Sequence, residues 1–268
     1  MEINRTNLFE IINKAGLKPD KDYGQNFLVE PDISKRIVDS LNIDDKDIVL
    51  EVGPGLGSLT HYLSLSGAQI TATDIDKRMT DFLKVVYQNN DVNVIENDIR
   101  REDVSNYTKI VGNLPYNITT ELIQFFLINA KSAKRFVFMI QSETYNHFSD
   151  VSGKEYGPTS VLIHLLGNIE KLFIVKAGSF HPVPKCNSTV FAINITNSNR
   201  EAAINAFKIS KQLFLNRRKT ILNNLINYLK NKELASKVCD DLNISPLSRP
   251  EQLAPETYLL ISEYLQSK

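Results

Sequence analysis

The stretch "VLEVGPGLGSLTHYL" (Val49 to Leu63) joins an apolar run to a glycine-rich loop and then to a segment with helical periodicity. A buried strand followed by such a loop and a helix is typical of the ligand-binding edge of an open α/β sheet. Gly53, Gly55 and Gly57 allow the backbone to approach a ligand closely. A helix that opens at Ser58 would present free N–H groups to the same ligand. The stretch therefore predicts an α/β fold with a binding site at this loop.

The segments around this loop extend the same pattern. Residues 48–195 alternate between strand-like and helix-like stretches, which predicts a mostly parallel sheet covered on both faces. The expected strands are 48–52, 69–73, 92–96, 109–113, 136–141, 171–175 and 189–195, and the expected helices are 58–66, 77–89 and 118–130. The last two strands are joined without a long helix, so we expect an antiparallel pair at the sheet edge.

The sequence changes after Ile195. A polar linker, "TNSNR", precedes helical periodicity without strand candidates, with expected helices at 201–215, 218–230, 233–242 and 251–265. We therefore expect two domains: a ligand-binding domain at 1–198, which includes an N-terminal extension at 1–25, and a small all-α domain at 199–268.

Composition excludes several classes of protein. The 268 residues are 42% hydrophobic and 23% charged, which is ordinary for a soluble globular protein. The apolar run at 136–140 is far too short to span a membrane. The N-terminus resembles neither a secretory signal nor a transit peptide, so we expect a cytoplasmic protein without a membrane partner. Cys186 and Cys239 have no metal-ligand spacing, so no metal site is expected.

Polar residues at three strand ends indicate the ligand. The glycine spacing is GxGxG rather than GxGxxG, with Ser58 where a third glycine would pack under a dinucleotide pyrophosphate. Asp74, after the second strand, is placed to accept hydrogen bonds from ribose hydroxyls, and Asp98, after the third, to meet an adenine amine. A ribose and an adenine without a pyrophosphate suggest S-adenosylmethionine. The alternative is a tight glycine turn with Asp74 as a solvent-facing cap.

The fourth strand ends in "NLPY", Asn113 to Tyr116. An adenine amine is a poor nucleophile, and methyl transfer to it needs acceptors that favour a more tetrahedral nitrogen. The Asn113 side chain and the Leu114 backbone carbonyl can be those acceptors, and they stabilise positive charge that develops on the nitrogen. Pro115 restricts Leu114 to extended backbone, and Tyr116 offers a face for stacking an extruded base. The alternative is a structural turn, with Asn as a cap, Pro as a stiffener and Tyr in the core.

The net charge is zero, but basic residues cluster between Lys208 and Lys237. This segment contains eight basic residues and a single acid, Glu233. A solvated helix face and a phosphate-binding surface both explain such a run.

Together these motifs resemble those of the rRNA adenine dimethyltransferases. The further segments that carry the resemblance are "YGQNFLVEPDI" (Tyr23 to Ile33), "FMIQSETYNHF", "GKEYGPTSV", "FHPVPKCNSTV", "LFLNRRKTILNNL" and "ISPLSRPEQLAPETYLLI". The third and the last two of these are typical of the KsgA-type, small-subunit branch. The resemblance extends from about residue 20 to 265 and implies a class I S-adenosylmethionine-dependent methyltransferase sheet with a helical C-terminal domain.

The family's functional residues can be placed on this chain where its motifs match. The resemblance implies three sets: cofactor-binding residues Gln25, Asn26, Leu28, Gly53, Gly55, Gly57, Asp74, Ile75, Asp98, Ile99 and Asn113; catalytic residues Asn113, Leu114, Pro115, Tyr116 and Phe180, with Phe180 on the other face of the target adenine; and RNA-binding residues Lys211, Arg217, Arg218 and Lys219. Asp74 stands where the family often has Glu. Val183, Cys186 and Asn187 replace the more usual Pro, Val and Asp.

The resemblance implies dimethylation of two adjacent adenosines near the 3′ end of 16S rRNA, in late biogenesis of the small ribosomal subunit, by a monomeric enzyme. Two alternatives remain open. One is a large-subunit rRNA methyltransferase that confers macrolide resistance, and the other is a non-catalytic ribosome-assembly factor.

Overall fold

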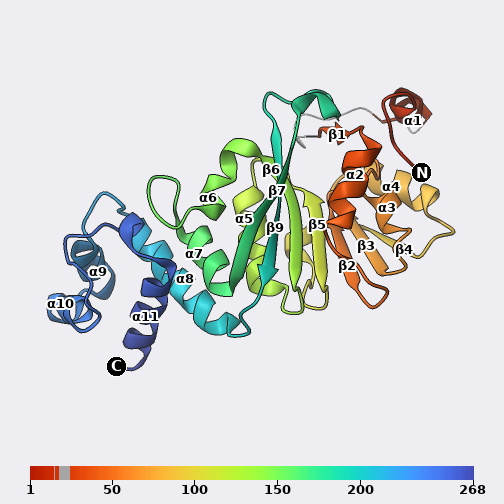
Figure 1. Ribbon diagram of the computed structural model, residues 1–268. Coiled ribbons are helices and arrows are strands. Elements are labelled where there is room, and N and C mark those ends of the chain that lie inside the picture. Colours follow the sequence, from red (N-terminus) through yellow and green to blue (C-terminus); the bar gives the residue numbers. More distant parts are fainter. Residues whose placement is uncertain (15, 18–24) are drawn as a thin grey trace. The chain divides into compact units, whose positions relative to one another are not determined.

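The structure, a computed structural model, describes residues 1–14, 16–17 and 25–268 (Figure 1). Tyr23 and Gly24, the first two residues of the expected N-terminal motif, lie outside the described residues. The chain forms two compact units, residues 1–143 with 170–194 and residues 144–169 with 195–268.

A seven-stranded sheet organises the first unit. Its strands are β2 (Ile48–Val52), β3 (Gln69–Asp74), β4 (Val92–Glu96), β5 (Lys109–Asn113), β6 (Arg135–Gln141), β7 (Gly167–Val175) and β9 (Ser188–Ile195). Their order is β4-β3-β2-β5-β6-β9-β7, which Figure 1 follows from β4 on the right. The five strands β4, β3, β2, β5 and β6 are parallel to one another, and β9 runs antiparallel to β6. The expected α/β sheet is confirmed, with β9 and β7 together at its edge.

The order of the strands creates a switch point between β2 and β5. From β2 the chain proceeds outward through β3 and β4, and it then returns to β5 on the other side of β2. Loops that leave neighbouring strands in opposite directions open a crevice at their carboxyl ends. The sequence therefore places the glycine loop after β2 and the Asn113 turn after β5 on the two sides of one crevice.

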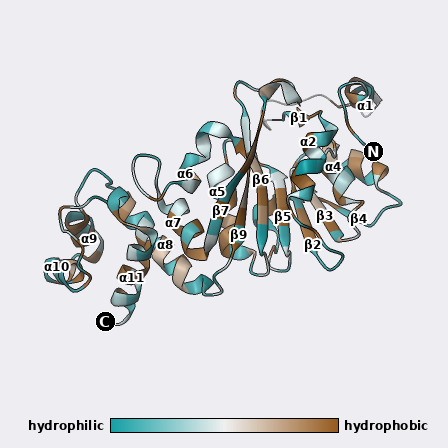
Figure 2. Ribbon diagram, in the orientation of Figure 1, coloured by the Kyte–Doolittle hydropathy of each residue, from teal (hydrophilic) through white to brown (hydrophobic). Residues whose placement is uncertain are grey.

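Apolar side chains of the sheet form the core. Figure 2 shows β2, β5 and β6 as largely hydrophobic, and Val49, Leu50, Ile110, Val111 and Val137 are fully buried. Continuous apolar runs of this kind are expected for parallel strands buried on both faces. The helices of this unit are α1 (Leu8–Lys14), α2 (Pro31–Asp39), α3 (Thr60–Leu63), α4 (Lys77–Val86) and α5 (Thr119–Asn129).

A second, two-stranded sheet joins distant parts of the sequence. Strand β1 (Phe27–Leu28) pairs antiparallel with β8 (Phe180–His181), and Leu28 lies opposite Phe180. Helix α1 contributes Leu8, Ile11 and Ile12 to a separate apolar cluster that includes Phe27 and Leu56 of the glycine loop. The N-terminal segment is therefore fixed beside the crevice.

The helix after the glycine loop differs from its prediction. It begins at Thr60 rather than Ser58 and is only four residues long. Gly57 has a φ of +93°, and the Ser58 hydroxyl donates to the Leu28 carbonyl at 2.7 Å, so these residues form a turn rather than helix. The expected helix N-terminus at Ser58 is therefore wrong, because the turn ties the loop to β1.

The second unit is mainly helical, and it also contains the first residues of β7 and the last residue of β9. Its helices are α6 (Asn146–Ser149), α7 (Pro158–Leu166), α8 (Arg200–Phe214), α9 (Ile221–Leu229), α10 (Lys232–Asp241) and α11 (Pro255–Gln266). Asn199, Thr220 and Asn231 cap α8, α9 and α10 with their side chains. Tyr156 and Tyr258 are fully buried in this unit, and the partly buried Phe214 ring lies 5.6 Å from the first and 5.9 Å from the second, measured between ring centroids.

Helix α7 was not expected from the sequence. It packs against α8 and α11, which is why residues 144–169 join the C-terminal helices in one compact unit. Seven of its nine residues are buried, so its sequence "PTSVLIHLL" lacks the polar face that would reveal a helix. The functional boundary expected at 198/199 stays a prediction. No described helix has the length and apolar character needed to cross a membrane.

Candidate active site

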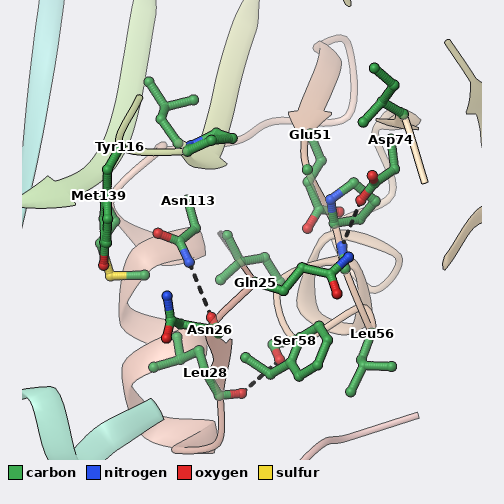
Figure 3. A pocket seen from close by; sticks show the side chains of 18 of the residues that line it. Gln25, Asn26, Leu28, Glu51, Leu56, Ser58, Asp74, Asn113, Tyr116 and Met139 are labelled. Carbon is green, nitrogen blue, oxygen red and sulfur yellow. Dashed lines mark hydrogen bonds between the residues drawn. The ribbon is translucent and has the colours of Figure 1, made fainter. Parts of the chain in front are cut away.

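A cavity of about 290 Å³ lies at the carboxyl ends of β2, β3 and β5, within the first unit. Its wall contains Gln25, Asn26, Phe27, Leu28, Glu51, Gly53, Pro54, Gly55, Leu56, Ser58, Leu59, Asp74, Ile75, Arg100, Asn113, Leu114, Pro115, Tyr116, Asn117, Ile118 and Met139. Figure 3 shows residues from β1, the glycine loop and the Asn113 turn around this cavity. Most of the cofactor-binding and catalytic residues expected from the sequence therefore line one cavity.

The three glycines of the loop do different things. Gly53 and Gly55 line the cavity, and both have positive φ angles, of 66° and 55°. Gly57 is not in the described wall. A Cβ at Gly57 would lie 2.8 Å from Leu83 of α4, so this glycine allows the loop to pack on α4. Among the three, Gly53 and Gly55 are the glycines that a ligand in the cavity can approach.

Asp74 ends β3 at the cavity wall and helps to hold the glycine loop. Its carboxylate accepts a hydrogen bond from the Gly55 N–H at 3.3 Å (Figure 3). It accepts another from the Asp76 N–H at 2.9 Å. Burial raises the pKa of Asp74. The next residue, Ile75, also lines the cavity and is 56% exposed. An acceptor and an apolar side chain thus lie together at this strand end.

Glu51 is a site residue that the sequence analysis did not identify. It precedes the glycine loop on β2, is 1% exposed and lines the cavity. Burial raises its pKa to about 8, although the Thr60 hydroxyl donates to it at 2.6 Å. An acid within an otherwise apolar strand was the available signal, because a buried carboxyl group carries a large desolvation cost.

The Asn113 turn is fixed from several sides. The Asn113 amide nitrogen donates to the Asn26 carbonyl at 3.5 Å, and Figure 3 shows the amide oxygen directed away from Asn26. The Leu114 N–H donates to the Met139 carbonyl at 3.1 Å. The Thr119 hydroxyl donates to the Pro115 carbonyl at 2.8 Å, which joins the turn to α5. The Asn113 oxygen is therefore available as an acceptor on a rigid support.

Tyr116 follows at the same wall and is partly buried. Burial raises the pKa of its hydroxyl, so the ring stays neutral at physiological pH. A neutral aromatic ring in a cavity wall is suited to stacking on a flat ligand.

Three other expected residues do not line the described cavity. Ile99 is buried, and Phe180 is 2% exposed, within the apolar core beside Leu28. The Asp98 carboxylate binds Arg100 through both oxygens, with its shortest contact, to Nη2, at 2.6 Å. Arg100 itself lines the cavity. The assigned roles of Asp98, Ile99 and Phe180 stay predictions.

The expected RNA-binding residues lie in the second unit. Arg217 donates to the carbonyls of Lys154 at 2.8 Å and Gly153 at 2.9 Å, so its guanidinium holds the loop before α7. Arg217 and Arg218 also line a hollow together with Lys154 and Arg249, which the sequence analysis had not selected. Lys211 lies on α8, with its amine 5.5 Å from the centre of the Phe207 ring. Lys219 follows Arg218 in the turn before α9.

Comparison with known proteins identifies relatives that match most of the chain. The model of the ribosomal RNA adenine dimethylase family matches residues 16–267. The ribosomal RNA small subunit methyltransferase A of Malacoplasma penetrans is 34% identical over 260 residues, which cover 92% of this chain and 92% of the relative. The protein of the same name from Streptococcus sanguinis is 32% identical and covers 96% of each chain.

Solved structures of methyltransferases share the fold. A dimethyladenosine transferase from Plasmodium falciparum superimposes with a TM-score of 0.76 at 24% identity, over 90% of this chain and 98% of that one. The 23S rRNA methyltransferase ErmE superimposes with a TM-score of 0.69 at 22% identity, over 90% of this chain and 100% of that one. At these identities the likeness concerns the fold, and it confirms the fold class expected from the sequence.

Proposed function

Because the chain belongs to the ribosomal RNA adenine dimethylase family, we propose that it transfers methyl groups from S-adenosylmethionine to adenine amines of ribosomal RNA. The observation that carries this proposal is the cavity at the switch point. There the glycine loop, Asp74 and the Asn113 turn, which lie far apart in the sequence, form one wall. A nucleoside site and an amine-holding turn in a single cavity suit transfer between two bound adenosines.

The cavity wall fits S-adenosylmethionine. Asp74 would accept hydrogen bonds from the ribose hydroxyls, and Gly53 and Gly55 leave room for the chain of the ligand. Glu51 and Asp74 bring two carboxyl groups to the wall. Their acceptor oxygens suit a ligand with a sulfonium and an ammonium group, and the positive charge of such a ligand would favour ionisation of Glu51. When bound, S-adenosylmethionine supplies an electrophilic methyl group. Gln25, Asn26 and Leu28 would close the cavity from the N-terminal side.

The Asn113 turn would hold the target adenine. The Asn113 amide oxygen and the Leu114 carbonyl would accept the two hydrogens of the amine, which directs the nitrogen lone pair away from the ring. As the nitrogen becomes positive, the same acceptors stabilise it, and the proton that it loses afterwards passes to water. Tyr116 would stack on the base, and Pro115 and the bond from Thr119 would keep the turn rigid. A monomethylated amine keeps one hydrogen for an acceptor, so the same site serves a second transfer.

The RNA substrate is part of the proposal. The relatives named above are small-subunit rRNA methyltransferases, which supports small-subunit rRNA as the substrate. Two adjacent adenosines near the 3′ end of 16S rRNA, modified late in subunit biogenesis, are what the KsgA-type resemblance implies. The basic residues of the second unit would contact the RNA backbone. A monomer in the cytoplasm and a functional boundary at 198/199 complete the proposal.

The test is mass mapping of rRNA after separate incubations of immature small subunits and of immature large subunits with the purified full-length chain and methyl-labelled S-adenosylmethionine. We expect labelled dimethyladenosine at two neighbouring positions of 16S rRNA. Label in 23S rRNA would support a large-subunit methyltransferase instead. Binding of subunits without any label would support a non-catalytic assembly factor, and either result would contradict the proposal.

Substitution of Asn113 tests the amine-holding turn. Asn113→Ala should lower the methylation rate at least about 100-fold, because a positioned acceptor for developing charge is lost, while subunit binding changes little. Asn117→Ala, an exposed asparagine at the same cavity, is the matched control and should keep most of the activity. Equal loss of methylation and subunit binding in Asn113→Ala would assign this residue a structural role.

A further inference from the structure

Arg100 is the one cationic side chain in the described wall of the cavity. It lies in the 3₁₀ turn Ile99–Arg101, which Asp98 caps two residues after the end of β4. A positive charge in the wall would repel the cationic cofactor proposed above, so the position of Arg100 requires an explanation. Its charge is offset by two carboxylates, those of Asp98 and Glu121, which leaves the shape and donors of the guanidinium as its contribution to the cavity.

The two carboxylates bind the edges of the guanidinium. Asp98 accepts from Nε at 2.9 Å and from Nη2 at 2.6 Å, and Glu121, in the first turn of α5, accepts from Nη1 at 2.9 Å. Hydrogen bonds to a guanidinium lie in its plane. Both acids therefore fix the plane of Arg100 from its rim, and neither covers its flat faces.

The direction of a bound nucleoside follows from the strand order. Its reacting end must reach Asn113 on β5, beyond β2, while its ribose is held at Asp74 on β3. The base then extends in the opposite direction, toward β4, which is the next strand outward. Arg100 follows β4 and lines the cavity, as does the half-exposed Ile75 after β3. Arg100 is therefore placed to contact a purine in this part of the cavity, whereas Asp98 is outside the described wall.

We propose that Arg100 is a cofactor-binding residue whose guanidinium face stacks on the purine of the nucleoside, and that Asp98 and Glu121 are positioning residues that orient it. This inference rests on the proposed cofactor. Asp98 would orient Arg100 beside the base in this arrangement. Stacking of a guanidinium on an aromatic ring is attractive and requires the planar group, which lysine lacks.

The test is calorimetric titration of the full-length chain and its variants with two probes, S-adenosylhomocysteine and 5′-methylthioadenosine. The second probe keeps the nucleoside but lacks the amino-acid end. Arg100→Ala should weaken both probes by the same factor, about tenfold. Arg100→Lys should weaken binding of both probes nearly as much, because lysine restores the positive charge but not the planar group. Arg101→Ala, in the same 3₁₀ turn but outside the described wall, is the control and should bind as the unmodified chain does.

Substitution of Glu121 tests whether this residue orients Arg100 or only stabilises the loop. Glu121→Ala should weaken both probes by a smaller factor than Arg100→Ala, and Glu121→Gln, which keeps an acceptor for Nη1, should recover most of the loss. Thermal unfolding of every variant is measured alongside. If Arg100→Ala does not fold, Arg100→Lys decides: weaker binding supports the proposal, and unchanged binding overturns it.

The inference and the proposed function fail in different ways. Failure of the unmodified chain to bind either probe would overturn the proposed cofactor. If the unmodified chain binds the probes and Arg100→Ala binds them with the same affinity, only the role of Arg100 is overturned. Full recovery of affinity in Arg100→Lys would also overturn it, because charge rather than the flat face would then matter.

Discussion

Asp74 and Asp98 both lie near the ends of neighbouring parallel strands, Asp74 as the last residue of β3 and Asp98 two residues after β4, but their surroundings differ. Asp74 lines the cavity and accepts hydrogen bonds from the backbone of the glycine loop and of Asp76. Asp98 caps a 3₁₀ turn, binds Arg100 and is outside the described wall. The pKa of Asp74 is raised by burial, whereas the Arg100 guanidinium lowers the pKa of Asp98. An acid at a strand end therefore acquires its role from its partners, and not from its position in the sequence.

The largest expected effect is on the free energy of unfolding, and it concerns Glu51, which shares the cavity wall with Asp74. The unfolded chain loses the Glu51 proton near its ordinary pKa of 4.5 and the folded chain near 8, so between these values the folded state binds more protons. The free energy of unfolding should therefore fall as pH rises through this window, by up to about 1.4 kcal/mol per pH unit. Glu51→Gln should remove this slope in urea unfolding at pH 5 to 8.

Glu96→Gln is the matched control, because Glu96 ends β4 with a side chain that is 42% exposed. It should leave the pH dependence of unfolding unchanged. The same slope in Glu51→Gln as in the unmodified chain would mean that Glu51 is ionised in the folded protein at neutral pH.

Removal of Asp74 should have the next largest effect. Asp74→Ala deletes the ribose acceptor and frees the Gly55 and Asp76 N–H groups, so we expect affinity for S-adenosylhomocysteine to fall about 100-fold, or about 2.7 kcal/mol. Asp74→Glu, which keeps the carboxylate, should lose less. Calorimetric titration measures both. A loss in Asp74→Ala no greater than that in Asp98→Ala would remove the contrast between the two acids.

The smallest effect is expected at Asp98. Asp98→Ala should weaken S-adenosylhomocysteine binding by up to about tenfold, because Arg100 loses its bidentate partner. If Asp98 acts through Arg100, the double variant Asp98→Ala/Arg100→Ala should bind no more weakly than Arg100→Ala alone. Additive losses in this double-mutant cycle would indicate that Asp98 contacts the base independently.

Much of the sheet could be predicted from the sequence. The expected bounds of β2, β4 and β5 match those observed, because apolar runs flanked by polar residues record burial directly. Most of the expected site residues also line one cavity, because parallel strands bring their carboxyl ends to the same edge. The pairing of Leu28 with Phe180 was not predictable in this way, since nothing local in either segment records a partner about 150 residues away.

Side-chain partners were the other part that the sequence did not reveal. Gly57 matches the binding motif but serves packing against Leu83, and Arg217 belongs to a basic run but holds the Lys154 and Gly153 carbonyls. In both cases residue type is compatible with either role. Helix α7 was missed because burial on all sides leaves no periodic signal.

The sequence by itself determined the α/β class, the family, the glycine loop and the Asn113 turn, because burial patterns, turn chemistry and motif spacing are local properties of the chain. Only the tertiary structure decided that Glu51 lies in the cavity wall, that Arg100 binds Asp98 and lines the cavity, and that Phe180 packs beside Leu28. The physical reason is that burial and hydrogen-bond partners of a side chain depend on segments brought together by folding, and these set its charge, orientation and access to a ligand.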